Sequence, residues 1–270
     1  MKQLKIINSL FAIGLLILLN SCENDIIEPD QIKRFSIESV NTGTNYEIQV
    51  VVPNSYNPNL KYETVYLLDG NSFYLKTEKI AKITDKLSGK YNKQNAIIVG
   101  ISSKNDRLRD FAPTINDAGE GGGSENYSKF IEFELIPKIE NDYAVATTAK
   151  SRVLIGHSLG GLLTGYFFTK HPNVFNNYLT LAPSFWWDNF LFFDYEEETR
   201  AVNATKNNLV FIGCGELDHL IVIGAKEWNH RLSTFYPNTK RDFQILPRLD
   251  HVSSAIGNAE AGLDFYFKNK

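Results

Sequence analysis

Hydrophobic and polar positions change their period along the chain, and these changes predict where strands and helices lie. Residues 33–40 and 46–52 alternate as antiparallel strands do, and the turn-forming residues 41–45 between them predict a hairpin. Beyond Pro53, continuous apolar runs typical of buried parallel strands alternate with segments of helical period. The predicted strands are 63–68, 95–101, 152–155, 177–181, 209–213 and 242–246, and the predicted helices are 74–87, 127–140, 159–170, 226–236 and 255–267.

This order of elements predicts an α/β fold, with a mostly parallel, doubly wound sheet and an N-terminal antiparallel hairpin. Phe130, Phe133 and Ile136 give residues 127–140 their helical spacing, and Pro137 predicts a kink or a boundary there. No internal linker is evident, so residues 32–270 are expected to form one domain.

The first 21 residues have the pattern of a signal peptide. Two lysines precede the apolar run 10–19, which is too short to span a bilayer comfortably. The run leads into Leu19-Asn20-Ser21-Cys22, which resembles the lipobox of bacterial lipoproteins, so we expect a lipid on the Cys22 thiol. A plain cleaved signal with an incidental cysteine is the alternative. Residues 22–31 are polar and acidic and are interpreted as a tether. We therefore expect an exported protein, lipid-anchored to a bacterial membrane in the periplasm or at the cell surface.

Charge and cysteine content exclude several classes of function. The formal net charge is −3 with acidic and basic residues mixed, which argues against nucleic acid as a partner. If Cys22 is acylated, Cys214 has no partner for a disulfide, and we expect it to be a small buried residue at a strand end. The Gly-rich loop 119–123 lacks the signature of a phosphate-binding loop. No side-chain cluster has the spacing of a metal site, so neither a metal nor an organic cofactor is expected.

The segment Gly156-His157-Ser158-Leu159-Gly160 is a G-x-S-x-G motif placed between a predicted strand and a predicted helix. In this motif the serine occupies a strained turn, which closes only where neighbouring side chains are absent, and we expect Gly156 and Gly160 to provide that absence. The helix that follows directs its positive end at the site. Ser158 is therefore the expected nucleophile, and an ordinary strand-to-helix turn is the alternative.

A serine hydroxyl is a weak nucleophile until a base takes its proton, and histidine has the pKa for that task. The chain has five histidines. His251 lies between the last predicted strand and the last predicted helix, where this topology returns to the serine, so it is the expected base. His157 is expected to point away from the serine and to be structural.

Two carboxylates are candidates for the acid that orients the base. Asp218 and Glu216 both follow the predicted strand 209–213, and Asp218 is preferred. Asp250 is a weaker candidate, because neighbours in an extended segment point apart. A Ser–His dyad without an acid also remains open. For the oxyanion hole, we expect the backbone amides of Leu159 and Asn71.

Together these residues resemble the putative-esterase family of the α/β-hydrolase superfamily, and within it the siderophore (enterobactin-type) esterases. Residues 106–114 resemble that branch's R-x-R-D-[FL]-T-P-T stretch, and residues 156–162 with 182–187 resemble its elbow and S-P-S-[LF]-W-W segment. Residues 67–70 match its oxyanion loop and residues 251–254 its histidine loop. Ala112 and Ala182 replace the usual Thr and Ser, which points to a different substrate.

The resemblance implies an α/β-hydrolase fold and a carboxylic ester hydrolase that works through an acyl-enzyme. Its substrates would be siderophore trilactones, or feruloyl and acetyl esters on polysaccharides. Arg107 and Arg109 would contact substrate, although an ion pair between Arg109 and Asp110 explains that arginine equally well. Trp186 and Trp187 would face the cleft or pack in the core.

Two further functions stay open. One is acyl transfer to an acceptor alcohol, and the other is a non-catalytic lipoprotein that binds a ligand on an esterase-like scaffold. We expect a monomer whose partners are a small-molecule or glycan ester and, through Cys22, a membrane.

Overall fold

The computed structural model describes residues 31–103 and 106–270. Within these ranges one eight-stranded sheet has the order β1-β2-β4-β3-β5-β6-β7-β8. The strands are β1 (Ile32–Glu38), β2 (Asn45–Val51), β3 (Thr64–Leu68), β4 (Ile97–Ile101), β5 (Arg152–His157), β6 (Asn177–Leu181), β7 (Leu209–Gly215) and β8 (Lys240–Leu246). The hairpin β1–β2 is antiparallel and joins β4 through an antiparallel pairing, whereas the pairings from β4 to β8 are parallel. The predicted fold class is confirmed.

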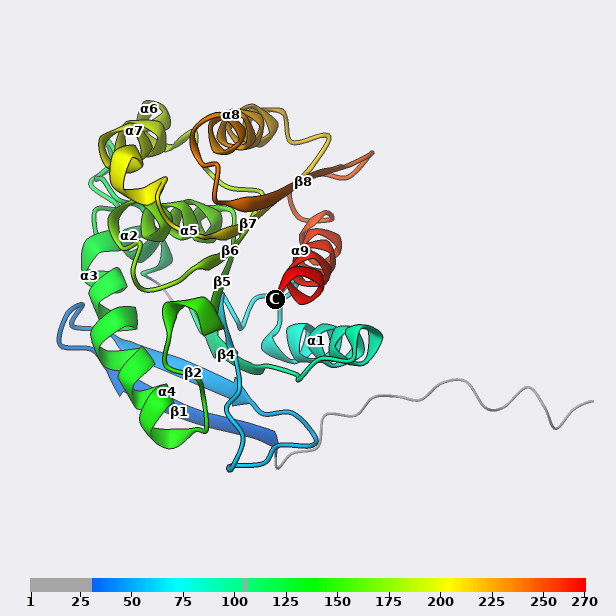
Figure 1. The fold of residues 1–270 in the computed structure, drawn as a ribbon. Coiled ribbons are helices and arrows are strands. Elements are labelled where there is room, and N and C mark those ends of the chain that lie inside the picture. The colour runs from blue at the N-terminus through cyan, green and yellow to red at the C-terminus, as the bar shows by residue number, and fades with distance from the viewer. Residues whose placement is uncertain (1–30, 104–105) are drawn as a thin grey trace, which may run out of the picture.

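Helices cover both faces of the sheet (Figure 1). They are α1 (Thr77–Tyr91), α2 (Arg107–Phe111), α3 (Ser124–Phe130), α4 (Ile136–Asp142), α5 (Leu159–Lys170), α6 (Trp187–Phe190), α7 (Phe192–Asn203), α8 (His219–Phe235) and α9 (Ala255–Asn269). A π-helical turn spans Ile131–Leu135 and a 3₁₀ turn spans Ala149–Ser151. Helices α1 and α9 pack together on one face, and α3, α4, α5, α7 and α8 lie on the other.

The parallel strands are buried on both sides, which explains their continuous apolar sequence. In β3, Val65 and Leu67 point to the core under α1 and α9, whereas Tyr66 and Leu68 point to the core on the opposite face. Side chains alternate between the faces along a strand, so each face receives its own apolar set. The sheet thus separates two hydrophobic cores and holds the loops at its carboxyl edge in place.

The predicted helix 127–140 is wrong as one α-helix. It consists of α3, the π-helical turn and α4, with Pro137 in the first turn of α4. Proline has no N–H to donate to the preceding turn, and a π-helical turn accommodates that missing bond. The extra residue in the turn also changes which face is buried. Phe133, expected on the apolar face, is exposed, whereas Phe130 and Ile136 are buried.

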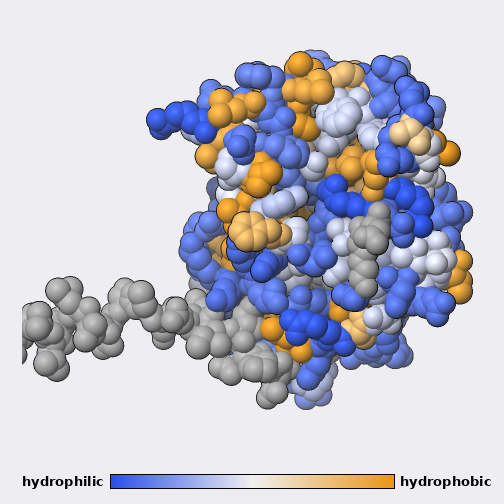
Figure 2. Space-filling view, turned by 180° about the vertical axis from the view of Figure 1, so that it is seen from behind, coloured by the Kyte–Doolittle hydropathy of each residue, from blue (hydrophilic) through white to orange (hydrophobic). Residues whose placement is uncertain are grey.

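The segment before β1 carries the predicted signal peptide, the predicted lipidation site Cys22 and nearly all of the tether, and these lie outside the described residues. No helix within residues 31–103 and 106–270 is long and apolar enough to cross a membrane. Seen from behind, hydrophobic residues form scattered patches among hydrophilic ones (Figure 2). Cys214 is buried near the end of β7 with a free thiol, as predicted, and burial raises the pKa of that thiol to about 12.

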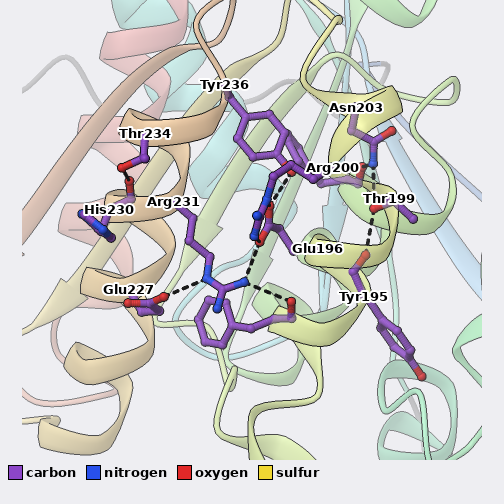
Figure 3. Close-up of polar contacts among 12 residues, drawn as sticks. Tyr195, Glu196, Thr199, Arg200, Asn203, Glu227, His230, Arg231, Thr234 and Tyr236 are labelled. Carbon is purple, nitrogen blue, oxygen red and sulfur yellow. Dashed lines mark hydrogen bonds and ion pairs between the residues drawn. The ribbon is translucent and has the colours of Figure 1, made fainter.

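Helix α7 contains a buried carboxylate (Figure 3). Glu196 accepts two hydrogen bonds from Arg200 at 2.7 and 2.8 Å, one from Arg231 of α8 at 2.7 Å, and one from the Tyr236 hydroxyl at 2.8 Å. Burial opposes the charge on Glu196, but these bonds outweigh it, so the pKa of the carboxyl lies below its ordinary value. The cluster joins α7 to α8 and to the loop after it.

We expect Glu196→Gln to lower the free energy of unfolding by about 3 kcal/mol at neutral pH, because it leaves two guanidinium groups short of their counter-charge. Glu227→Gln is the matched control. Glu227 also binds Arg231, but its side chain is 42% exposed, and surface pairs contribute about 1 kcal/mol or less. Urea denaturation measures both. Since a depressed pKa contributes stability that is lost as pH falls through it, the deficit of Glu196→Gln should shrink in acid. Equal losses for the two variants would contradict this role.

Candidate active site

The predicted site residues lie at the carboxyl edge of the sheet, where parallel α/β folds place their sites. Ser158 follows β5, Asp218 follows β7, and His251 follows β8. The turn at 69–71 follows the neighbouring strand β3. Strands β3 and β5 are neighbours, as are β7 and β8, and β6 lies between the two pairs. Residues far apart in the sequence therefore follow strands that end at one edge of the sheet.

Ser158 sits on a strained turn between β5 and α5. Its backbone has φ 63° and ψ −120°, a region that residues other than glycine seldom adopt. The Ser158 amide donates to Leu181 O at 2.9 Å, and its carbonyl accepts from Ser184 N at 3.0 Å, so β6 and the loop after it support the turn. The Ser158 hydroxyl lies 3.4 Å from the Ser184 hydroxyl.

The glycines that this turn requires differ partly from those expected. A Cβ at Gly156 would lie 2.1 Å from Gly160 O, and one at Gly161 would lie 2.8 Å from Pro183 Cα. A Cβ at Gly160 would lie 3.5 Å from its nearest neighbours, an ordinary contact distance. The steric requirement therefore falls on Gly156 and Gly161. The expectation for Gly160 was wrong because a Cβ there would meet Leu68 and Asp69 only at ordinary contact distance.

We expect Gly156→Ala and Gly161→Ala each to lose about 2–3 kcal/mol or more of folding free energy, because backbone atoms must move to make room. Gly160→Ala should be neutral or stabilising, since alanine is the better helix former. Thermal denaturation of the three variants checks this order. A Gly160→Ala protein that melts lowest of the three would contradict the assignment of the steric requirement to Gly156 and Gly161.

His251 and Asp218 are in direct contact. The Nδ1 atom of His251 lies within hydrogen-bond distance of the Asp218 carboxylate. Glu216 instead accepts the backbone N–H of Arg248 at 2.7 Å. Asp250 accepts from the backbone and hydroxyl of Ser253 within its own loop. Among the three acids considered, Asp218 is the one that the structure places against the imidazole.

The loop that carries His251 rests against the elbow. The ring of His157, 1% exposed, lies 4.6 Å from the ring of His251, and His157 Nε2 lies 2.8 Å from His251 O. His157 immediately precedes Ser158, so this contact joins the histidine loop to the elbow. Among the described residues, the Ser158 hydroxyl itself contacts Ser184 and makes no hydrogen bond with His251.

The turn after β3 lies against the first turn of α5. Asp69 adopts a positive φ of 56°, and its carboxylate is held by Arg107 through two bonds of 2.8 and 2.7 Å. Asn71 exchanges hydrogen bonds with the backbone of Ser103, at 3.1 and 3.2 Å, which joins this turn to the loop after β4. The amide of Leu159 belongs to the first turn of α5, where backbone N–H groups have no acceptor within the helix. The two amides expected to form the oxyanion hole thus belong to elements that adjoin each other.

The arginines and tryptophans differ in their surroundings. Arg109 binds Asp110 at 2.7 Å and the Thr44 hydroxyl at 2.9 Å, which fixes α2 to the N-terminal hairpin. Trp187 is buried and donates to the Thr114 hydroxyl at 3.0 Å, whereas Trp186 is 38% exposed. The ion-pair interpretation thus fits Arg109, and core packing fits Trp187.

Sequence reasoning missed two contributions to the site. Ser184 supports the turn of Ser158 and was identified only as part of a motif. Arg107 was considered for substrate binding, whereas its guanidinium binds Asp69 and also donates to His157 O at 3.2 Å. An arginine close to an acid in a predicted loop is the only sequence signal for such a pair, and it does not select the partner.

Comparison with known proteins places the chain in a family. The sequence profile of the family described as "Putative esterase" matches residues 39–245. The chain belongs to this esterase family. The match ends before His251.

The ferri-bacillibactin esterase BesA of Bacillus subtilis is 30% identical to this esterase over 203 residues, covering 67% of this chain and 69% of the relative. The BES protein from Bacillus cereus superposes with a TM-score of 0.79 at 28% identity, covering 91% of this chain and 98% of that structure. An IroE-like serine hydrolase from Shewanella oneidensis gives a TM-score of 0.77 at 23% identity, covering 88% and 80%, and supports the fold alone. The resemblance to siderophore esterases is confirmed, and we assign this esterase to the carboxylic ester hydrolases.

Proposed function

We propose that this esterase hydrolyses carboxylic esters through an acyl-enzyme on Ser158, and that its substrates are siderophore trilactones. The observation that carries the catalytic part is the contact of His251 Nδ1 with Asp218 on a loop that rests against the serine turn. A carboxylate at Nδ1 fixes the imidazole orientation and leaves Nε2 to exchange protons with the serine.

The reaction has two halves. The Ser158 hydroxyl attacks the ester carbonyl while His251 Nε2 takes its proton, and the oxyanion is stabilised by the amides of Leu159 and Asn71. Collapse of this intermediate breaks the ester bond, and the leaving alcohol receives the proton from His251. A water molecule then loses a proton to His251 and attacks the acyl group. The bond between the acyl group and Ser158 Oγ breaks, His251 returns the proton to that oxygen, and the acid is freed. Each oxyanion donor is worth about 10²–10³ in turnover.

The substrate part rests on the relatives and on the surroundings of the site. BesA is named for its action on ferri-bacillibactin, and another relative, which is 26% identical over 168 residues, is an apo-salmochelin esterase of Escherichia coli. In this chain, exposed apolar side chains follow the strands that carry the site: Phe73 after β3, Trp186 after β6, Leu217 after β7 and Val252 after β8. Such a rim suits substrates with large apolar or aromatic groups.

The test compares p-nitrophenyl acetate and butyrate, a catechol-type trilactone with and without iron, and methyl ferulate. Ser158→Ala protein provides the background rate. We expect turnover of the p-nitrophenyl esters. We also expect hydrolysis of the trilactone to linear products, with one water added for each ester bond cleaved, detected by mass spectrometry. Turnover of methyl ferulate without trilactone cleavage would overturn the substrate class. Ester products formed on added alcohol in place of acids would indicate acyl transfer. No turnover above background on any ester would overturn the catalytic proposal and favour a binding protein.

A further inference from the structure

His157 occupies an unusual position between the two reacting residues. It ends β5, directly before Ser158, and its side chain is 1% exposed. The ring of Tyr74 packs edge-on at 5.1 Å, and the ring of His251 lies 4.6 Å away. The charged groups nearby are Asp69 and Arg107. Substrate has no route to a ring enclosed in this way, so any influence on the reaction must pass through its neighbours.

The bond from His157 to the histidine loop defines its tautomer. His157 Nε2 lies 2.8 Å from the carbonyl oxygen of His251. A carbonyl only accepts, so Nε2 must carry the proton. His157 Nδ1 then has a bare lone pair, and it is buried without a partner among the described residues.

Because His157 Nδ1 has no partner among the described residues, a histidine at this buried position lowers the free energy of unfolding relative to an apolar residue. A buried polar atom without a partner costs free energy that leucine or phenylalanine would not incur. Burial lowers the pKa of His157 to about 4, and the adjacent His251 adds to the effect, so the ring is neutral near neutral pH. A neutral ring donates one hydrogen bond and adds no positive charge beside His251. What the histidine provides at this position is therefore the donor on Nε2.

Through this donor, a single residue, His157, connects the proposed nucleophile, Ser158, to the proposed base, His251. Ser158 is covalently bonded to His157, and the main chain of His251 is held by the His157 side chain. Asp218 holds the other end of His251 at Nδ1. The His251 carbonyl also lies 3.5 Å from the Ser254 hydroxyl, at the limit of a hydrogen bond, so His157 supplies the shorter contact.

We propose that His157 is a positioning residue, whose Nε2–H fixes the backbone of His251 at the separation from Ser158 that proton transfer requires. The proposal rests on the assignment of Ser158 and His251 as the reacting pair. The rate of proton transfer between side chains falls steeply as the distance between them grows. Displacement of a reacting group by about 1 Å can lower the rate about 10²-fold.

Three variants distinguish the effect of the Nε2–H hydrogen bond from the effect of the packed ring. Glutamine can place its amide nitrogen close to the position of histidine Nε2, asparagine places its nitrogen near Nδ1, and leucine has no donor. We expect His157→Leu and His157→Asn to lower kcat and the rate of Ser158 labelling by diisopropyl fluorophosphate about 10–100-fold, with KM changed less than about threefold. His157→Gln should recover most of both rates.

Full rates in folded His157→Leu, or equal losses in His157→Gln and His157→Leu, would overturn the role of the donor. Wild-type protein gives a second test that needs no variant and no activity. Long-range ¹H–¹⁵N NMR should show His157 protonated at Nε2 and neutral from pH 5 to 8, a range about one unit or more above its lowered pKa. A proton on Nδ1, or titration within that range, would overturn the proposal. Wild-type protein that neither reacts with the fluorophosphate nor hydrolyses esters would contradict the proposed function instead.

Discussion

Ser158→Ala is expected to lower kcat for p-nitrophenyl butyrate by about 10⁴–10⁶-fold, because no other group would accept the acyl chain. The strained backbone at φ 63° places the half-buried Ser158 side chain at the edge of the sheet. Stopped-flow or steady-state assays of the variant measure the loss. An unchanged melting temperature would show that the loss is chemical.

Ser184→Ala is the matched control for Ser158→Ala. The two hydroxyls lie 3.4 Å apart, so a general disturbance of this region would affect both variants. The Ser184 side chain offers at most one hydrogen bond to Ser158, and its removal should cost about fivefold or less in kcat. A larger loss in Ser184→Ala than in Ser158→Ala would reverse the assignment of the nucleophile.

Asp218→Asn is expected to lower kcat by about 10³–10⁴-fold while leaving KM and stability nearly unchanged. The Asp218 carboxylate touches His251 Nδ1, where it selects the tautomer that leaves Nε2 free to act as the base. An amide is neutral and cannot stabilise the imidazolium that forms during the reaction. Steady-state kinetics on p-nitrophenyl butyrate measure the effect.

Glu216→Gln is the matched control for Asp218→Asn, because both acids follow β7 and only their partners differ. Glu216 accepts the Arg248 backbone N–H, so its substitution should change kcat less than about tenfold. Near wild-type rates in Asp218→Asn would favour a Ser–His dyad. A loss confined to Glu216→Gln would identify that residue as the acid.

Apolar periodicity predicted the sheet because the parallel strands are buried on both faces. Helix α7 was missed for the opposite reason. Its buried face carries Glu196 and Asn203 beside Phe192 and Phe193, so polar residues interrupt the apolar pattern. A buried carboxylate needs partners, and Glu196 has Arg200 in its own helix and Arg231 in α8. The partner in α8 is not revealed by any local pattern. Helix α8 was predicted too short because its first turns hold a β-branched run that resembles a strand.

The site was predictable as far as motif and topology determine it. The motif identifies Ser158, and the loop after β8 identifies His251, because each residue follows a strand at the same edge of the sheet. The contacts that hold them were not predictable. His157 meets the backbone of His251 across 94 residues of sequence, and Arg107 meets Asp69 across 38. These contacts depend on side-chain geometry that appears only when the loops are placed in space.

The most direct test of the central claim is the site of reaction with diisopropyl fluorophosphate, a reagent that marks activated serines. Intact-mass measurement, followed by peptide mapping, locates the adduct while residual ester hydrolysis is followed in the same sample. We predict one adduct, on the peptide that contains Ser158, whose formation parallels the loss of activity and which is absent from Ser158→Ala. Activity lost with the adduct on another residue, or retained with Ser158 fully modified, would contradict the account.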